Sequence, residues 1–191
     1  MSEIEVAGLI LAAGSGSRFG EAPKLLAELD GAPLLEHAIG AQLAVPAIER
    51  TVVVLGAFAD ELLAGIDFAG CETVICPDWD EGQAASLRCG VAELAGARKV
   101  IVTLGDEPLI TPQVIARFLD QPPGARATYG GRPGHPVVLG PKLMRQIAGL
   151  SGDQGARELL RGGRRIECGH LAVGADVDTP ADLEAVRARQ G

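Results

Sequence analysis

Short apolar runs recur along the first half of the chain and alternate with amphipathic segments. The runs are nearly continuous and rich in β-branched residues, which is typical of strands buried on both faces of a parallel sheet. They cover Val6–Ala12, Thr51–Leu55, Thr73–Cys76 and Val100–Leu104. The segments between them predict helices over Leu34–Leu43, Ala59–Ala64 and Ala84–Leu94. This alternation predicts an α/β fold, a single domain over residues 1–191 with a doubly wound, mostly parallel sheet.

The second half of the chain carries clear helix starts and a segment dense in Pro and Gly. Thr111-Pro112 and Thr179-Pro180 each place a capping side chain before a proline at the first helical position. Residues 121–141 (QPPGARATYGGRPGHPVVLGP) predict loops with two short strands, Ala125–Tyr129 and Pro136–Leu139. No linker or repeat in this half indicates a second domain.

Composition and charge limit the kinds of molecule that the chain is expected to bind. Hydrophobic residues make up 47% of the chain and aromatic residues only 3%, so the core must be aliphatic. The net charge of −8 argues against binding to a nucleic-acid backbone, which needs a positive surface. The first residues, MSEIEVAGLILAAG, lack a basic leader, and their apolar run is short and ends in glycine. They predict a first strand and neither a signal peptide nor a membrane span.

The four cysteines form no C-x-x-C pair, and no histidine stands near them at zinc-ligand spacing. We expect Cys71, Cys76, Cys89 and Cys168 to be free thiols. Free thiols are typical of a cytoplasmic protein, and we expect that location.

A glycine-rich loop in GLILAAGSGSRFGEAPK, from Gly8 to Lys24, follows the first predicted strand. It is not a Walker A loop, because its lysine stands between proline and leucine. It also departs from the dinucleotide fingerprint, because the third glycine comes one place late, at Gly20. Two interpretations stay open. The loop is a triphosphate site in which amides, Arg18 and Lys24 bind phosphate, or it is a plain turn that binds nothing.

LILAAGSGSRFGEAPK resembles the signature loop of nucleotidyltransferases, which move a nucleoside monophosphate from an NTP to a phosphate or sugar phosphate. The chain is most similar to the MobA/MocA-like group and, within it, to the molybdenum cofactor cytidylyltransferases. The resemblance rests on segments that follow in order along nearly the whole chain: Leu11–Lys24, GQAASLRCG at Gly82–Gly90, LGDEPLI at Leu104–Ile110, RPGHPVVL at Arg132–Leu139, and GDQGARELL with DVDTPADL near the end. It implies the Rossmann-like fold of nucleotide-diphospho-sugar transferases.

The resemblance implies that the loop binds the phosphates of the nucleotide. The residues concerned are Leu11, Ala12, Ala13, Gly14, Ser15, Gly16, Ser17, Arg18 and Lys24. Arg18 offers a planar fork for two phosphate oxygens, and Lys24 offers a compact charge. Both are implied to be catalytic together with Asp106, because transfer of this kind depends on positioning and on neutralising charge.

Asp106 ends the apolar strand in VIVTLGDEP, at the edge where open α/β sheets bind ligands. The resemblance implies that Asp106 and Asp178 hold Mg2+, which prefers hard oxygen ligands. Asp176 shares a face with Asp178 if the segment is extended, so its part in the metal site stays open. Asp178 also fits a plainer interpretation, an acidic residue stabilised by a helix N-terminus. Glu107, where relatives often have Gln or Met, is expected to be a solvated neighbour.

Ala13 and GQAASL are implied to select the base. The guanylyl branch of the family usually has glycine at the place of Ala13, so the resemblance favours CTP over GTP. Gly82 and Ser86 are the expected contacts in the base pocket. The alternative is that GQAASL is only a helix start, because glycine can cap a helix.

RPGHP is the family's motif on the acceptor side and implies that Gly134 and His135 bind the acceptor. The proline that follows holds His135 in an extended or turn conformation. A purely structural histidine is the alternative. Asp153 and Arg157, in GDQGAR, either join the acceptor site or pair with each other on one face of a helix.

Together the motifs imply Mg2+-dependent transfer of CMP from CTP to the phosphate of molybdopterin, with release of pyrophosphate and with a molybdoenzyme as client. Three alternatives stay open. One is the same transfer with another NTP or phosphorylated acceptor. Another is a non-catalytic nucleotide- or cofactor-binding accessory protein for a molybdoenzyme. The last is an NAD(P)-binding oxidoreductase, which rests on the imperfect glycine pattern alone.

Overall fold

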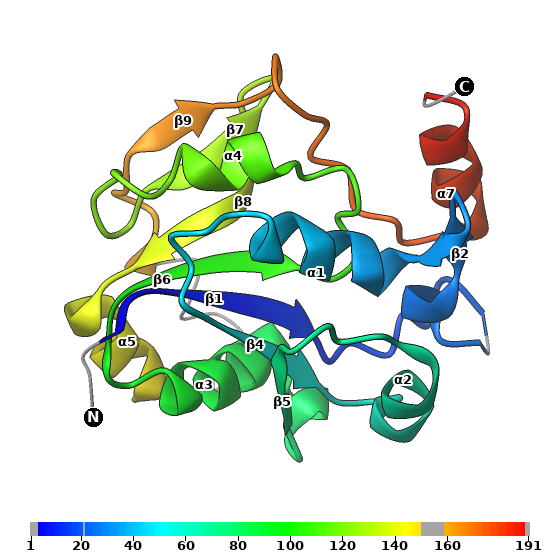
Figure 1. Cartoon of the computed structure of the whole chain (residues 1–191), viewed down its shortest axis with the longest axis horizontal. Coiled ribbons are helices and arrows are strands. Elements are labelled where there is room, and N and C mark those ends of the chain that lie inside the picture. Colours follow the sequence, from blue (N-terminus) through cyan, green and yellow to red (C-terminus); the bar gives the residue numbers. More distant parts are fainter. Residues whose placement is uncertain (1–3, 21, 150–158, 190–191) are drawn as a thin grey trace.

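The computed structural model describes residues 4–20, 22–149 and 159–189. Within these ranges, seven strands form one sheet in the order β5-β4-β1-β6-β8-β7-β9 (Figure 1). Neighbours among β5, β4, β1 and β6 are parallel, and so are β7 and β9, whereas β8 runs antiparallel to both β6 and β7. The strands are β1 (Ile4–Ala12), β4 (Arg50–Leu55), β5 (Glu72–Ile75), β6 (Ala97–Leu104), β7 (Arg126–Tyr129), β8 (Arg132–Leu139) and β9 (Arg165–Glu167). The predicted α/β fold with a mostly parallel sheet is confirmed.

Helices cover both faces of this sheet (Figure 1). One face packs against α3 (Gln83–Glu93) and α5 (Pro141–Ala148). The other face packs against α1 (Leu34–Leu43), α2 (Ala59–Gly65) and α4 (Pro112–Ala116). Outside these layers, α7 (Pro180–Arg187) packs beside the small ribbon of β2 (Glu28–Leu29) and β3 (Ala32–Pro33). The short 3-10 helices η1 (Lys24–Leu26) and η2 (Trp79–Glu81) lie in connections.

Successive side chains of the central strands enter different cores, which explains their continuous apolar character. Leu9 and Leu11 of β1 pack with Val102 of β6 on the side of α3 and α5. Ile10 of β1 packs with α1 and α2, and Ile101 of β6 packs with α4. A strand covered on both faces therefore buries mostly apolar side chains, with Thr51 of β4 and Thr103 of β6 as buried polar exceptions.

The predicted elements of the first half are present, with boundaries shifted by at most three residues. Both Thr-Pro starts form as predicted, because Thr111 and Thr179 accept hydrogen bonds from amides of their own first turns. The structure adds α5 and β9, which the sequence analysis did not predict. It also begins β8 at Arg132, four residues before the predicted start at Pro136.

The expectation of four free thiols is wrong for one pair. Cys76, directly after β5, and Cys89, on α3, form a disulfide with Cα atoms 5.8 Å apart. Their spacing does not reveal the pair, because the two residues meet only where α3 packs against β5. Cys71 and Cys168 are free within the described part of the chain. Disulfides are rare in the cytoplasm, so the thiols no longer support the expected location.

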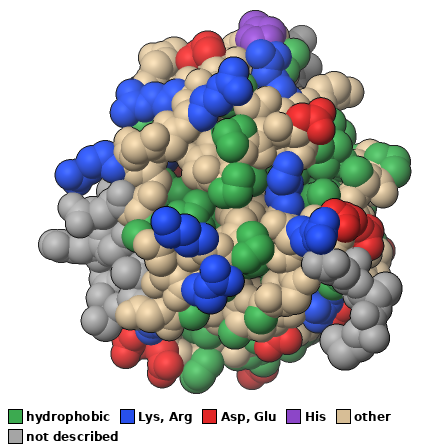
Figure 2. Space-filling view, turned by 90° about the vertical axis from the view of Figure 1, so that its left-hand side faces the viewer, with side chains coloured by type: hydrophobic (Ala, Val, Ile, Leu, Met, Phe, Trp, Pro, Cys, Tyr) green, Lys and Arg blue, Asp and Glu red, His purple; other side chains and the backbone are tan. Residues whose placement is uncertain are grey.

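One side of the molecule carries many basic side chains. Figure 2 shows them on the side that lies at the left of Figure 1, among apolar, uncharged and some acidic side chains, although the net charge of the chain is −8. Exposed basic residues of the second half include Arg132, Lys142, Arg145, Arg164 and Arg165. None of the described helices combines the length and the apolar character needed to cross a membrane.

Candidate active site

The strand order reverses at the centre of the sheet, between β1 and β6. The chain passes from β1 to β4 on one side and later to β6 on the other, which leaves a crevice at the carboxyl ends of β1 and β6. The glycine-rich loop leaves β1 here, and Gly105-Asp106 leaves β6. The amide of Gly105 donates a hydrogen bond to the carbonyl of Leu11 (2.9 Å), which fixes Asp106 beside the loop.

The glycine-rich loop turns back on itself so that Lys24 reaches the crevice. Gly16 has a φ of +57°, and its carbonyl accepts a hydrogen bond from the amide of Phe19 (2.7 Å). A Cβ at Gly16 would lie 3.1 Å from Cγ and Cδ of Lys24, so the bare glycine backbone packs on the lysine stem. Glycine is needed here both for the left-handed turn and for this close approach.

Asp178 reaches the same point from the far end of the sequence. The amide of Val177 donates to the carbonyl of Asp106 (2.9 Å), so the segment before α7 lies alongside the end of β6. Thr179 then caps α7 in a reciprocal capping box with Asp182. The Asp182 carboxylate also accepts from the amide of Asp178 (3.2 Å), which fixes the backbone of the predicted metal ligand.

The four predicted charged residues form one connected cluster. Lys24 Nζ lies 2.6 Å from Asp106 Oδ2 and 3.1 Å from Asp178 Oδ1. Arg18 Nη2 lies 2.8 Å from Asp178 Oδ2. Lys24 is only 8% exposed, and burial alone would lower its pKa; the Asp106 and Asp178 carboxylates outweigh burial, so the pKa of Lys24 is raised. Lys24 is therefore a buried ammonium that is charged at neutral pH and lies between two carboxylates.

The donor set at Asp106 and Asp178 fits a metal ion only in part. Both residues offer hard carboxylate oxygens, which Mg2+ prefers. The described residues contain no group of three or more His, Cys, Asp or Glu that could hold a metal ion. A site with three or more protein ligands is not required, because Mg2+ is commonly bound by one or two carboxylates together with substrate phosphates. The pair fits an ion that arrives with a nucleotide.

A cavity of about 330 Å3 lies beside this cluster. It is lined by seven of the predicted nucleotide-binding residues: Leu11, Ala13, Gly14, Ser15, Gly82, Ser86 and Asp106. Trp79, Asp80, Gln83 and Leu104 complete the wall, and the sequence analysis missed them. The available signal was Trp79, the single tryptophan of the chain, which stands three residues before GQAASL.

The other predicted nucleotide-binding residues lie near this cavity without lining it. Ala12 faces the opposite core, because neighbouring residues of a strand point to opposite faces. Gly16 supports Lys24, while Ser17 and Arg18 are exposed at the outer side of the loop. Of the acceptor residues, Asp153 and Arg157 lie outside the described residues.

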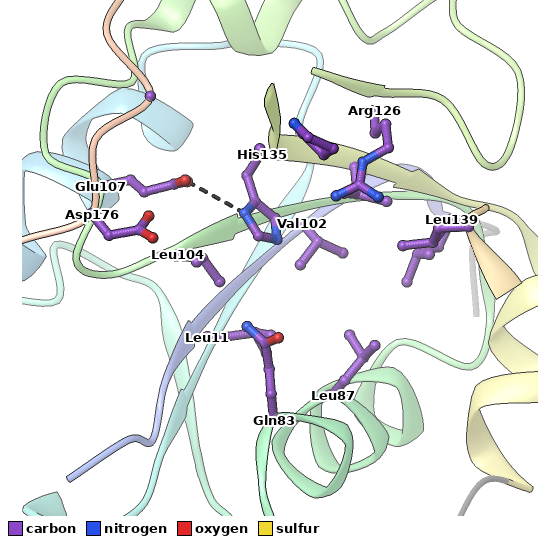
Figure 3. Close-up of a pocket in the computed structure, with 15 residues that line it drawn as sticks. Leu11, Gln83, Leu87, Val102, Leu104, Glu107, Arg126, His135, Leu139 and Asp176 are labelled. Atoms are coloured by element: carbon purple, nitrogen blue, oxygen red, sulfur yellow. Dashed lines mark ion pairs between the residues drawn. The ribbon is translucent and has the colours of Figure 1, made fainter. Parts of the chain in front are cut away.

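A second cavity, of about 480 Å3, adjoins the first and contains Gly134 and His135 in its wall (Figure 3). The two cavities share Leu11, Gln83 and Leu104. Figure 3 shows Glu107, Asp176 and His135 gathered at one end, with Leu11, Val102, Leu104, Leu87 and Leu139 along the walls. The predicted acceptor motif thus lies next to the predicted nucleotide site.

His135 is held by its backbone and faces a buried carboxylate. The hydroxyl of Tyr129 donates to the carbonyl of His135 (2.7 Å), and the peptide bond from His135 to Pro136 is cis. His135 Nδ1 lies 3.5 Å from Glu107 Oε2. Burial lowers the pKa of His135, but the nearby Glu107 carboxylate more than compensates, so that pKa is raised.

Two acidic residues depart from their expected places. Glu107 is not a solvated neighbour: it is 3% exposed, because its side chain turns inward beside the second cavity. Asp176 lines this second cavity, whereas Asp178 pairs with Lys24 and Arg18. Partial burial, with Glu107 and Asp106 nearby, raises the pKa of Asp176 to about 7.

Comparison with known proteins places this geometry in a family. The model of the MobA-like NTP transferase domain matches residues 8–169. Nicotine blue oxidoreductase from Paenarthrobacter nicotinovorans is 34% identical over 189 residues, which cover 91% of this chain and 92% of that protein.

Solved structures agree. The crystal structure of Rv0371c from Mycobacterium tuberculosis H37Rv has a TM-score of 0.85 at 26% identity, covering 98% of this chain and 100% of that one. Rv0371C in complex with manganese has a TM-score of 0.76 at 27% identity, covering 96% and 98%. Because the matched family model spans the glycine-rich loop, Asp106 and His135, the chain belongs to the MobA-like NTP transferase family and is a nucleotidyltransferase.

Proposed function

We propose that this nucleotidyltransferase moves CMP from CTP to the terminal phosphate of molybdopterin and releases pyrophosphate. The observation that carries the proposal is the Lys24 ammonium between Asp106 and Asp178, beside a nucleotide-sized cavity that shares a wall with a second cavity. A donor in the first cavity and an acceptor in the second would meet at one charged cluster. Transfer needs this juxtaposition, because it depends on positioning more than on covalent chemistry by the protein.

The cations of the loop suit a triphosphate. Negative charge grows on the leaving pyrophosphate during an in-line displacement at the α-phosphorus. Lys24 stays protonated at neutral pH, because the two carboxylates raise its pKa. Arg18 is exposed and can fold its planar guanidinium over phosphate oxygens. The acceptor phosphate is already an anion at neutral pH, so the reaction needs no dedicated general base.

Asp106 and Asp178 are the residues that would hold Mg2+. When bound with the nucleotide, the ion supplies further neutralisation of charge on the phosphate oxygens. The manganese complex of Rv0371C, at 27% identity, supports a divalent ion at sites of this fold. The protein's own part is to fix both carboxylates through the backbone contacts of Gly105 and Val177.

The base pocket favours a pyrimidine. Ala13 is 3% exposed, and its methyl group occupies cavity wall that the guanylyl branch leaves to a glycine. Gly82, with a φ of +110°, lets the chain pass from η2 into α3, so that Trp79 and Ser86 lie on the same wall. These features support CTP as the donor. We place the reaction in the cytoplasm, with a molybdoenzyme as the client that receives the finished cofactor.

A second candidate is an NAD(P)-binding oxidoreductase. The observation in its favour is the 34% identity to nicotine blue oxidoreductase over nearly the full length of both chains. The glycine spacing of the loop argues against it, because the third glycine falls one place late for a dinucleotide site. The two candidates differ in the ligand that each must bind.

Thermal unfolding with ATP, CTP, GTP, UTP and NADPH, each with and without Mg2+, separates them. A ligand at about 100 times its Kd adds roughly 2.7 kcal/mol to the free energy of unfolding, which for this chain length raises Tm by roughly 5–10 °C. We expect a Mg2+-dependent shift with CTP, followed by pyrophosphate release when molybdopterin is added. A metal-independent shift with NADPH would favour the oxidoreductase over the transferase. A Tm shift with CTP but no release of pyrophosphate with any acceptor would favour the remaining alternative, a non-catalytic accessory protein.

A further inference from the structure

The two carboxylates proposed to hold the metal ion are in contact with cations of the glycine-rich loop. Lys24 Nζ lies 2.6 Å from Asp106 Oδ2 and 3.1 Å from Asp178 Oδ1. Arg18 Nη2 lies 2.8 Å from Asp178 Oδ2. Three of the four oxygens of this carboxylate pair therefore contact the two side chains that the proposed function assigns to phosphate.

The Lys24 ammonium lies in the place that a shared ion needs. Mg2+ binds carboxylate oxygens at about 2.0–2.1 Å, so an ion held by both Asp106 Oδ2 and Asp178 Oδ1 would lie in the gap between these oxygens. Lys24 Nζ lies in the same gap, where it donates hydrogen bonds to both oxygens. Two positive charges at this separation repel each other strongly. Lys24 and a shared divalent ion therefore exclude each other.

The surroundings of Lys24 leave the end of its side chain free to turn. Its stem packs on the backbone of Gly16, where a Cβ would lie 3.1 Å from Cγ and Cδ of the lysine. Arg18 is held less firmly, because its side chain is 72% exposed and can leave Asp178 without disturbing the core. The carboxylates can be reached as well, since their side chains are 20% and 30% exposed and Asp106 lines the nucleotide-sized cavity.

A triphosphate offers both cations more negative charge than the carboxylates do, and its oxygens accept the bidentate hydrogen bonds that arginine donates. We propose that Lys24 and Arg18 block the metal site in the free protein. They keep Asp106 and Asp178 from binding a free divalent ion, and an incoming triphosphate unblocks the pair by drawing both cations onto its own oxygens. This inference rests on the proposed function and adds a rule for how nucleotide and ion bind. Each favours the binding of the other, which is positive coupling between two ligands.

The first test titrates Mn2+ alone into the full chain. The EPR signal of free Mn2+ disappears on binding, so each titration gives a Kd without nucleotide or turnover. Lys24→Met keeps the apolar stem and removes the ammonium. We expect it to bind Mn2+ about tenfold or more tightly than the wild type does, because two carboxylate oxygens lose a charged hydrogen-bond donor. Arg18→Met releases one oxygen from an exposed ion pair, so we expect a smaller gain of about two- to fivefold.

Lys142→Met is the matched control for net charge. Lys142 is exposed on α5, and its loss should leave the Mn2+ affinity unchanged. An equal gain in Lys142→Met and Lys24→Met would overturn the inference, because net charge alone would then explain it. A wild type that binds Mn2+ as tightly as Lys24→Met and Arg18→Met would also overturn it. If Lys24→Met does not fold, the comparison of Arg18→Met with Lys142→Met carries the test.

The second test follows the cations from the carboxylate side. Inorganic triphosphate, which carries no base, is titrated by calorimetry in metal-free buffer. Asp178→Asn keeps the size of the side chain and removes the charge that holds both Lys24 and Arg18. We expect it to bind triphosphate about tenfold more tightly than the wild type does. Asp60→Asn, at an exposed position of α2, is the matched control and should bind as the wild type does. Equal triphosphate affinity in Asp178→Asn and the wild type would contradict the exchange.

A parallel assay of CMP transfer from CTP to molybdopterin separates this inference from the function on which it rests. Transfer by the wild type, with no gain of Mn2+ affinity in Lys24→Met or Arg18→Met, defeats the inference alone. A gain of Mn2+ affinity in these variants, with no transfer by the wild type, defeats the proposed function and leaves the exchange of cations standing.

Discussion

The nucleotide half and the acceptor half of the site are constructed in different ways. In the nucleotide half, opposite charges satisfy one another: Lys24 bridges Asp106 and Asp178. In the acceptor half, Glu107 Oε2 and His135 Nδ1 have no hydrogen-bond partner within the described residues. The first half lies at the ends of the parallel strands β1 and β6, and the second extends from these strands over β8, which runs antiparallel to β6. Pairs of opposite charge hold the first half in place, whereas in the second half Glu107 Oε2 and His135 Nδ1 face each other 3.5 Å apart.

This difference between the two halves predicts different effects for substitutions in each. A change in the nucleotide half should affect charge balance, catalysis and stability together, because the same contacts serve all three. A change in the acceptor half should affect binding of the acceptor and leave the nucleotide bound as before. The following variants test this division.

Lys24→Met removes the central charge and keeps the apolar stem that packs on Gly16. We expect the rate of nucleotidyl transfer to fall by about 100- to 1,000-fold, as for the loss of one preorganised group that stabilises developing charge. Steady-state pyrophosphate release measures the rate. Lys142→Met, on the exposed face of α5, is the control and should stay within about twofold of the wild type. A Lys24→Met enzyme with more than a tenth of the wild-type rate would show that the cluster does not carry the reaction.

The stability effect of Lys24 has a definite pH dependence. Its pKa is raised in the folded state above the ordinary value of 10.5. The stabilising contribution is therefore fully present below pH 10.5 and is lost only as the pH rises through the raised value. We expect the difference in Tm between the wild type and Lys24→Met to stay constant from about pH 7 to pH 9. A difference that vanishes within that range would contradict the assignment.

Cys89→Ser removes the crosslink that ties α3 to the end of β5. The closed loop spans 13 residues, and crosslinks of this length stabilise by about 3 kcal/mol in the chain-entropy model. For a chain of this size that corresponds to a fall in Tm of roughly 6–12 °C. Thermal unfolding under non-reducing conditions measures it, and peptide mapping should find Cys76 joined to Cys89. Cys71→Ser, which touches a free thiol, should leave the crosslink in place.

Reduction of the wild type should reproduce the Cys89→Ser value. The segment between the two cysteines contains Trp79, Gly82 and Ser86, so the crosslink bears on the wall of the nucleotide cavity. We expect CTP to bind more weakly after reduction, because the closed loop no longer orders that wall. Equal CTP affinity in both redox states would show that the disulfide affects stability and not nucleotide binding.

The sequence predicted which residues of the nucleotide half lie close together, and the reason is geometric. In a parallel sheet the carboxyl ends of neighbouring strands meet at one edge, so residues that follow β1 and β6 must lie together. Asp106 comes just after β6, Lys24 ends the loop that follows β1, and Asp178 was placed by the family pattern. The motif residues Leu11, Ala13 and Gly14 line the cavity as a strand end and loop should.

The acceptor half could not be predicted in the same way. Glu107 stands next to Asp106 in the sequence, and nothing local shows that its side chain turns inward under β8. His135 and Asp176 reach the same cavity through antiparallel pairing of β8 and through the segment before α7. Such contacts depend on register between distant segments, which hydrophobic periodicity does not encode. The Cys76–Cys89 pair was missed for the same reason.

Gly16→Ala tests the turn that delivers Lys24. The new alanine would have to adopt a φ of +57°, and its Cβ would lie 3.1 Å from the Lys24 stem. A left-handed conformation costs an alanine about 1–2 kcal/mol, so we expect Tm to fall by a few degrees and CTP to bind more weakly. Gly14→Ala, in the same loop, has no heavy atom within 4 Å of its new Cβ and should leave Tm unchanged. Equal Tm values for the two variants would mean that the turn is not strained by a side chain.

Of these variants, Glu167→Gln should have the smallest effect. Glu167 lies beside the turn between β7 and β8, at the edge of the acceptor half. Glu167 Oε1 accepts from the amides of Gly130 (2.9 Å) and Gly169 (3.1 Å), and its Oε2 accepts from the amide of Gly131 (3.2 Å) and the hydroxyl of Thr128 (2.8 Å). These bonds, led by that of Gly130, lower the pKa of Glu167 to about 2. The carboxylate thus fixes the turn between β7 and β8.

The sign of the pH dependence follows from the lowered pKa. The contribution of Glu167 to stability is present above its ordinary pKa of 4.5 and is lost as the pH falls toward 2. We expect Glu167→Gln to unfold at a lower Tm than the wild type at pH 7, with the two curves converging as the pH approaches 3. Glu61→Gln, at an exposed position of α2, serves as the control, with no difference at either pH. Because the turn belongs to the acceptor half alone, the CTP-induced shift should be equal in both proteins. A weaker CTP shift in Glu167→Gln would show that the two halves are mechanically coupled and that the division drawn between them is wrong.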